Sequence, residues 1–186
     1  HLYKLNVSGL RFFTVYGPRG RPDMAPFKFV DRISCGVEIQ KFGDGTSSRD
    51  YTFISDIVDG VIRSIDRPYP YQVFNLGKGD GTSLNEFISI VEEHTGKEAV
   101  IRQLPDQPGD VPYTCASIGK AKVLLGYEAT VSFEEGIGRM VDWYKASRGN
   151  DGSGKVPTEK PGIRTRGFRR LPSWAQIVAR STIISK

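Results

Sequence analysis

The first 148 residues alternate between strand-like and helix-like segments, and this order limits the possible folds more than any other feature of the sequence. The strand-like segments are short and rich in β-branched and aromatic residues, whereas the others carry apolar residues at helical spacing. The expected strands are 6–13, 37–42, 51–53, 71–76 and 99–103, and the expected helices are 25–35, 55–66, 83–95, 117–125 and 133–147. This alternation predicts an α/β fold, in which some partners of the strands need not lie in this chain.

Local signals set the ends of the expected helices. Gly36 and Gly96 each follow a helical segment, at the position where a glycine in a left-handed conformation commonly ends a helix. Ser83 and Glu86 form a capping box, in which each side chain can accept a hydrogen bond from the backbone N–H of the other residue. Ser55 is expected to cap the helix that runs to residue 66.

The last part of the chain, residues 149–186, differs from the rest in composition and charge. The net charge of +5 arises there, because eight lysines and arginines but only two acidic residues follow residue 150. The segment is rich in Gly, Pro and polar residues, so we expect a basic, disordered tail. Its arginine-rich run, 164–170, is interpreted as solvated rather than as a contact for membranes or polyanions. The basic charge therefore does not predict that the body binds nucleic acid.

Cysteine usage and hydropathy exclude two further classes of protein. Cys35 and Cys115 have no spacing typical of a zinc site or of a disulfide scaffold, so we expect reduced thiols and no metal. No apolar run approaches the roughly 20 residues that cross a bilayer. We therefore expect no membrane contact through this segment.

The run Gly77-x-Gly79-x-Gly81 lies between an expected strand and an expected helix, where dinucleotide-binding glycines commonly lie. Its spacing differs from that fingerprint, which requires its third glycine at Thr82. The fingerprint also normally opens the first βα unit of its fold. We therefore interpret the run as a turn that leads into a capped helix, and not as an NAD site.

A loop rich in arginine follows the first expected strand. Thr14, Tyr16, Arg19 and Arg21 lie close together in this loop. In open α/β sheets, ligands bind beyond the carboxyl ends of the strands, so an anionic ligand could meet Thr and Arg donors here. A surface loop with solvated arginines explains the same spacing equally well.

Several segments occur in the order expected of one known family. They are RFFTVYGPRGRPDMA, SSRDYTFISDIVDGV, FNLG, QPGDVPYTCAS and KAKVLLGYEATVSFEEGIGRMVDWY. Together they resemble the C-terminal half of the extended short-chain dehydrogenases/reductases, and specifically the UDP-glucuronate 4-epimerases, from residue 1 to about residue 147. The resemblance implies the C-terminal part of an extended Rossmann-type fold with its small substrate-binding region, NAD as cofactor and a UDP-sugar as ligand.

The resemblance also implies contacts with the sugar and the uridine. Thr14 stands where related sugar-nucleotide epimerases often have Asn, and with Arg21 it resembles the pattern specific for uronates. A hydroxyl donor and a guanidinium can hold the C5 carboxylate that distinguishes glucuronate from glucose. Met24, Ala25 and Phe27 resemble the segment that lines the uridine pocket.

Further positions resemble contacts with the phosphates and the cofactor. Arg49 is similar to the family arginine that pairs with the UDP diphosphate, and Asp110 matches an acidic position near the ribose and phosphates. Epimerases of the galactose type have an Arg upstream of that acidic position, where this chain has Gln107. Tyr16 and Pro18 resemble the turn that passes the nicotinamide end of the cofactor.

Two essentials of the family are absent from this sequence. There is no N-terminal glycine-rich NAD loop, and no Tyr is followed four positions later by Lys, so we expect no catalytic residue in this chain. The chain is interpreted as an inactive fragment of an isomerase that converts UDP-glucuronate to UDP-galacturonate through a 4-keto intermediate. The alternatives are a UDP-glucuronate decarboxylase, a sugar-nucleotide 4,6-dehydratase, or a catalytically dead sugar-nucleotide-binding module.

The resemblance implies partners and compartments as well. Family members often dimerise, so the full-length protein is expected to be a homodimer. The compartment is expected to be the cytoplasm, or the Golgi membrane if an upstream part carries an anchor.

Overall fold

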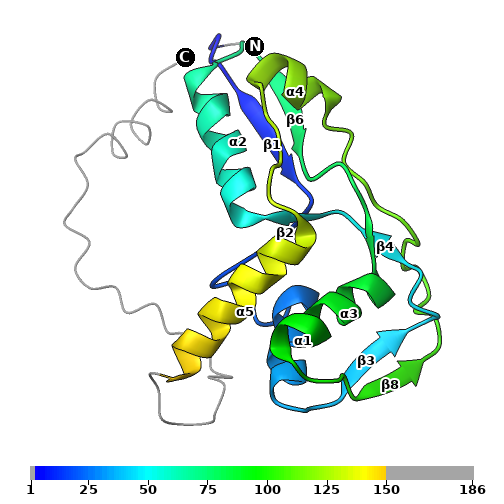
Figure 1. Cartoon of the computed structure of the whole chain (residues 1–186). Coiled ribbons are helices and arrows are strands. Elements are labelled where there is room, and N and C mark those ends of the chain that lie inside the picture. The colour runs from blue at the N-terminus through cyan, green and yellow to red at the C-terminus, as the bar shows by residue number, and fades with distance from the viewer. Residues whose placement is uncertain (1–2, 150–186) are drawn as a thin grey trace, which may run out of the picture. The chain divides into compact units, whose positions relative to one another are not determined.

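The computed structural model describes residues 3–149, which Figure 1 shows in colour. The strands are β1 (Ser8–Phe12), β2 (Thr14–Tyr16), β3 (Ile39–Phe42), β4 (Ser48–Arg49), β5 (Tyr51–Phe53), β6 (Gln72–Leu76), β7 (Thr82–Ser83) and β8 (Ile101–Leu104). The helices are α1 (Ala25–Ser34), α2 (Ile54–Asp66), α3 (Leu84–Thr95), α4 (Gly119–Leu125) and α5 (Phe133–Gly149). The predicted α/β alternation is therefore confirmed, while the predicted tail beyond residue 149 lies outside the described residues.

Three strand pairs are parallel and join segments that lie far apart in the sequence. β1 pairs with β6, with Ser8 opposite Gln72 and Phe12 opposite Leu76. β2 pairs with β5, and β3 pairs with β8. Among the described strands, β4 and β7 form the one antiparallel pair. Parallel pairs require long crossover connections, and the helices occupy these connections.

The chain passes directly from β1 into β2 and changes its strand partner at this point. The N–H of Phe13 donates to the C=O of Leu76 at 3.2 Å, and the N–H of Thr14 donates to the C=O of Asp50 at 3.1 Å. The carboxyl ends of β1 and β6 therefore lie beside the start of β2, where the predicted loop begins.

The helix ends predicted from glycine and serine are confirmed. Gly36 and Gly96 follow α1 and α3 with φ angles of 66° and 70°, a left-handed conformation that glycine adopts without steric cost. The Oγ of Ser83 accepts a hydrogen bond from the N–H of Glu86 at 3.2 Å, which is one half of the predicted capping box. These ends depend on local sequence, and local sequence was sufficient to find them.

The prediction that Ser55 caps α2 is wrong. Phe53, the last residue of β5, is the N-cap of α2, and its side chain makes no hydrogen bond to the helix. Ser55 lies exposed in the first turn. In the same turn, the buried carboxylate of Asp56 accepts a hydrogen bond from the N–H of Val131 at 3.2 Å. Because Phe53 is buried in the core, the strand passes straight into the helix and the helix begins earlier than expected.

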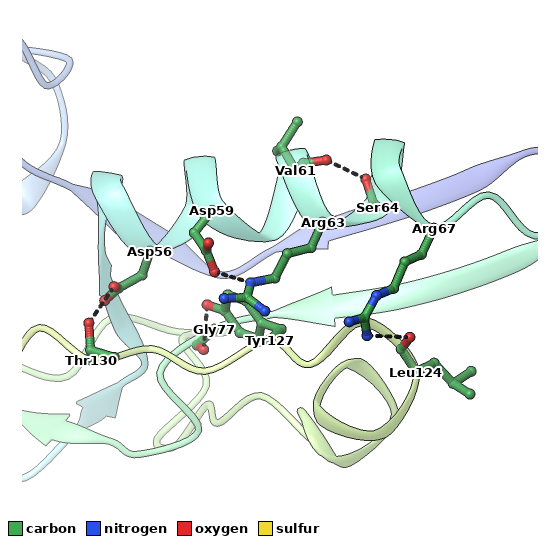
Figure 2. A network of polar contacts seen from close by, with 10 residues as sticks. All are labelled: Asp56, Asp59, Val61, Arg63, Ser64, Arg67, Gly77, Leu124, Tyr127 and Thr130. Atoms are coloured by element: carbon green, nitrogen blue, oxygen red, sulfur yellow. Dashed lines mark hydrogen bonds and ion pairs between the residues drawn. The ribbon is translucent and has the colours of Figure 1, made fainter.

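Buried apolar side chains form two clusters. The larger core cluster packs α1, α3 and α5 against β2 and β5, and it contains Tyr16, Phe29, Val30, Ile33, Ile39, Tyr51, Phe53, Phe87, Ile88, Val91, Val131, Ile137, Met140, Val141 and Tyr144. The smaller core cluster lies between α2, α4 and β6, and it contains Ile57, Phe74, Leu76, Ala121, Leu125 and Tyr127. Figure 2 shows polar contacts that join α2 to the segment 124–130, from Arg67 to the C=O of Leu124 and from Thr130 to Asp56.

No helix within residues 3–149 is both long enough and apolar enough to cross a membrane. In the same range, no group of three or more His, Cys, Asp or Glu side chains is placed to hold a metal ion. Cys35 and Cys115 are free thiols.

Candidate functional site

A cavity of about 720 Å³ opens where β1 passes into β2. Its walls come from residues 12–15 of these strands, from Arg21 and Met24 before α1, from Arg49 in β4, and from Thr114 in the loop after β8. We call it the first cavity. Four residues that the resemblance singled out, at positions 14, 21, 24 and 49, are thus brought together by segments distant in sequence.

A second cavity of about 410 Å³ lies beside α1, β3 and β5. Ala25 and Asp110, both expected at the nucleotide, are among the residues that line it. Phe29 and Phe42 contribute aromatic surface, and Lys28 contributes a positive charge. The walls thus combine apolar side chains with charged ones, which are Asp23, Lys28, Arg32, Arg49 and Asp110.

Arg49 lines both cavities, so this residue lies between them. Its side chain is only 23% exposed, and Nη2 pairs with Oδ1 of Asp110 at 2.5 Å. Nη1 donates to the C=O of Ser48 at 2.9 Å. These contacts hold the guanidinium in one orientation, and its other N–H donors stay available for an anion.

Thr14 and Arg21 both line the first cavity, but Thr14 is held more firmly than Arg21. Thr14 is fixed by its backbone bond to Asp50, whereas Arg21 is exposed and pairs with Asp23. The hydrogen bond from Arg21 holds the pKa of the Asp23 carboxyl below its usual value. Such an exposed ion pair is weak, so Arg21 can exchange Asp23 for the carboxylate of a ligand.

Tyr16 is a core residue in this structure and lines neither cavity. It is 3% exposed, and its hydroxyl donates to the C=O of Phe133 at 3.2 Å. Its ring packs edge-on against Phe53. Burial, and to a lesser extent the charge of Asp56, raises the pKa of Tyr16 far above its usual value. The hydroxyl is thus engaged with the start of α5.

Phe27 and Pro18 also lie away from the two cavities. Phe27 points toward α5, where its ring packs edge-on against Trp143 and Tyr144. Pro18 lies in a tight turn that the hydrogen bond from the N–H of Gly20 to the C=O of Gly17 closes. Contact of Pro18 with a cofactor stays a prediction.

Several cavity residues were not found from the sequence. Lys28 lies one helical turn after Met24, and its N–H donates to the C=O of Met24 at 3.0 Å. Phe42 ends β3 and is 37% exposed, which is unusual for an aromatic side chain in a short strand. Thr114 lies in the loop that pairs with Ser48. The spacing of Lys28 from Met24 was visible in the sequence, but the positions of the other two depend on long-range pairing.

The glycine run does not fit the pyrophosphate of NAD. The N–H groups of Lys78 and Gly79 donate to the carboxylate of Asp50 at 2.8 and 2.9 Å, so this turn already holds an anion of the protein itself. The described residues that line the cavities instead suit an elongated ligand with an anionic centre at Arg49.

Comparisons with known proteins show which family the chain resembles. Residues 1–140 match the family described as GDP-mannose 4,6 dehydratase. The UDP-glucuronate 4-epimerase of Thermodesulfobacterium geofontis is 47% identical over 146 residues, which cover 78% of this chain and 45% of that protein. A probable UDP-glucuronate 4-epimerase of Rhizobium meliloti is 42% identical over 163 residues, which cover 77% of this chain and 48% of that protein.

Solved structures give the same result. The UDP-glucuronic acid 4-epimerase of Bacillus cereus, in complex with UDP-4-deoxy-4-fluoro-glucuronic acid and NAD, superposes with a TM-score of 0.72 at 36% identity. The match covers 77% of this chain and 46% of that one. The UDP-glucose 4-epimerase of Thermotoga maritima with UDP-glucose superposes with a TM-score of 0.74 at 33% identity, covering 78% and 48%.

The chain spans about half the length of the curated relatives that it matches. The family match extends over most of the described residues, and the fold matches that of epimerases solved with their ligands. On this evidence, the chain belongs to the GDP-mannose 4,6-dehydratase family of extended short-chain dehydrogenases/reductases, with UDP-glucuronate 4-epimerases among its relatives.

Proposed function

We propose that this chain is the substrate-binding part of an NAD-dependent UDP-sugar 4-epimerase, and that its substrate is UDP-glucuronate, converted to UDP-galacturonate. The position of Arg49 on both cavities carries the proposal. A UDP-sugar has a nucleoside at one end, a sugar at the other and a diphosphate between them. Two cavities with a guanidinium at their junction match that order, because guanidinium donors bind phosphate oxygens through charge-assisted hydrogen bonds.

The second cavity suits the nucleoside. Its aromatic walls, Phe29 and Phe42, can contact the flat face of a base, and the start of α1 at Ala25 offers backbone groups to the polar edge of uracil. Lys28 adds a positive charge on the same side. The relative from Bacillus cereus was solved with a uridine nucleotide sugar, which supports uridine as the base.

The first cavity suits an acidic sugar. Thr14 and Arg21 both line it, and together they offer a hydroxyl donor and a planar fork of N–H donors. A carboxylate at C5 of the sugar can accept from both groups. UDP-glucose lacks this carboxylate, so the pair provides a basis for choosing the uronate.

A binding experiment on the 186-residue chain tests the proposal. We expect calorimetry to show binding of UDP, and Arg49→Gln to weaken it about 10-fold or more, since a hydrogen bond to a charged group contributes roughly 1.5–3 kcal/mol. Arg63→Gln is the matched control, because Arg63 pairs with Asp59 on α2 and lines neither cavity. A wild-type chain without affinity for UDP contradicts the proposal.

The choice of sugar is tested with Arg21→Ala. We expect this variant to weaken binding of UDP-glucuronate more than binding of UDP-glucose, because only the uronate has the carboxylate. Equal weakening of both ligands contradicts the assignment of the uronate.

We propose further that the chain by itself does not turn over substrate, since its sequence has no Tyr-x-x-x-Lys pair and its glycine turn is occupied by Asp50. Epimerase assays with added NAD on the purified 186 residues test this. Turnover at a rate above that of an Arg49→Gln control contradicts it, and identifies a catalytic group that the family pattern does not include.

A further inference from the structure

Asp50 is a fully buried carboxylate next to the arginine on which the proposed function depends. It is 0% exposed and lies between β4, which carries Arg49, and β5. Its Oδ1 accepts hydrogen bonds from the N–H of Lys78 at 2.8 Å and from the hydroxyl of Thr52 at 3.1 Å. A buried charge is stable only when its lone pairs are satisfied, and here backbone donors contribute to this.

The other carboxylate oxygen joins two more segments. Oδ2 accepts from the N–H of Gly79 and from the N–H of Ala116, both at 2.9 Å. The close approach requires a glycine at position 77, since a Cβ there would lie 2.3 Å from Cβ of Ala116 and 2.9 Å from Oδ2. The C=O of Gly77 accepts from the hydroxyl of Tyr127 at 2.9 Å, as Figure 2 shows. The turn formed by the glycine run therefore binds the Asp50 carboxylate through the N–H groups of Lys78 and Gly79.

The loop that Asp50 holds at Ala116 leads to a wall of the first cavity. Ala116 follows Thr114, which lines the first cavity and whose N–H donates to the C=O of Ser48 at 3.1 Å. The N–H of Ser48 donates to the C=O of Pro112 at 2.8 Å. On its other side, the C=O of Asp50 accepts from the N–H of Thr14. Asp50 thus connects Thr14 and the 112–116 loop to β4, the strand that carries Arg49.

We propose that Asp50 is a positioning residue that fixes the backbone of Arg49 and the loop bearing Asp110, and so aims the guanidinium at the diphosphate. The inference rests on the proposed function, because it assigns Asp50 a role through Arg49. The carboxylate touches no ligand and takes part in no proton transfer. Its hydrogen bonds join three chain segments, which are β5 at Thr52, the glycine turn at 78–79 and the loop at Ala116.

The substitution Asp50→Asn tests this role with little change of volume. An amide presents one acceptor oxygen and one NH2 donor, so at least one of the three backbone N–H groups would face another donor. We expect the glycine turn or the 112–116 loop to separate from β4 and Arg49 to lose its fixed direction. Asp56→Asn is the matched control, since Asp56 is also buried, also accepts a backbone N–H and lines neither cavity.

Calorimetry with UDP and with uridine separates positioning from general stability. We expect Asp50→Asn to weaken UDP binding about 10-fold or more while uridine affinity changes less than about 2-fold, because the lost contact is the one to the phosphates. Asp56→Asn should lower the thermal midpoint without changing either affinity. The double variant Arg49→Gln with Asp50→Asn should bind UDP no more weakly than Arg49→Gln alone.

Unchanged UDP affinity in Asp50→Asn, or an equal loss for UDP and uridine, overturns the inference and leaves the proposed function standing. A wild-type chain that does not bind UDP instead contradicts the proposed function, and this inference with it. If Asp50→Asn does not fold, Thr52→Val decides, because it removes one donor to the same carboxylate without leaving a charge unpaired. It should weaken UDP binding several-fold but not uridine binding, and wild-type UDP affinity in this variant overturns the inference.

Discussion

The two core clusters differ in size and in the elements that pack around them. The larger core cluster is enclosed by three helices and two strands, and its rings contact one another, as Phe87 does with Phe29, Tyr51 and Phe133. The smaller core cluster is covered by α2, whose inner side buries Ile57. The outer side of α2 leaves apolar residues exposed, and they are Ile54 at 39%, Val58 at 48%, Ile62 at 52% and Ile65 at 70%.

This difference separates two regions of the chain. Phe29 and Tyr51 belong to the larger core cluster and also line the second cavity, so the proposed nucleoside site lies directly on that core. None of the buried residues of the smaller core cluster lines either cavity. The proposed nucleoside site and the larger core cluster therefore lie in the same part of the chain.

The largest effect is expected from Phe87→Ala in the larger core cluster. Phe87 is 0% exposed and contacts three aromatic rings, so its removal should lower the free energy of unfolding by about 3–5 kcal/mol. Phe74→Ala is the matched change in the smaller core cluster, since Phe74 is also 0% exposed. We expect a smaller loss there, because Phe74 contacts one aromatic ring, that of Tyr69, whereas Phe87 contacts three. Urea unfolding measures both, and a larger loss for Phe74→Ala would reverse the comparison.

Substitutions on the two sides of α2 are expected to differ in their effect on the free energy of unfolding. Ile57→Ala should cost about 2–5 kcal/mol, because Ile57 is buried against β6, whereas Ile62→Ala should cost less than about 0.5 kcal/mol. The two substitutions are chemically identical and lie in one helix, so helix propensity cancels between them. Urea unfolding at several protein concentrations is the measurement. A cost for Ile62→Ala that grows with concentration would show that the outer side is covered by association.

Sequence reasoning located the ends of α1 and α3, because glycine and serine signals act within a few residues. It failed for α2, since the start of that helix is set by the burial of Phe53 and not by a capping side chain. It also missed β4 and β7, whose two residues each are strands only because Arg49 lies opposite Thr82. No pattern within either segment contains that pairing.

The candidate site was predictable to a similar extent. The resemblance identified Thr14, Arg21 and Arg49, and the structure places them around one cavity. It did not reveal that Tyr16 faces the core, because that depends on where α5 packs. The sequence did not point to Asp50, because the backbone N–H groups that bind its carboxylate lie 28 residues or more away in the sequence.

The last comparison concerns the hydroxyl of one buried tyrosine in each core cluster, Tyr51 in the larger and Tyr127 in the smaller, and its effect on the free energy of unfolding. Burial raises the pKa of Tyr51 to about 12, and burial also raises the pKa of Tyr127 above its usual value. A raised pKa means that the folded state holds the proton more tightly than the unfolded state, whose pKa is about 10. The resulting stability is fully present below pH 10 and, for Tyr51, is lost as pH rises to about 12.

Removing each hydroxyl should therefore have different consequences. Tyr51→Phe should leave the free energy of unfolding almost unchanged at pH 7 and make its decline between pH 10 and pH 11 shallower. Tyr127→Phe should already cost about 0.5–1.5 kcal/mol at pH 7, because it removes the hydrogen bond to the C=O of Gly77. Urea unfolding of both variants at pH 7, 10 and 11 checks this. If Tyr51→Phe declined as steeply as the wild type, Tyr51 would not contribute to the alkaline loss, and the core behind the nucleotide site would be more open to water than its burial indicates.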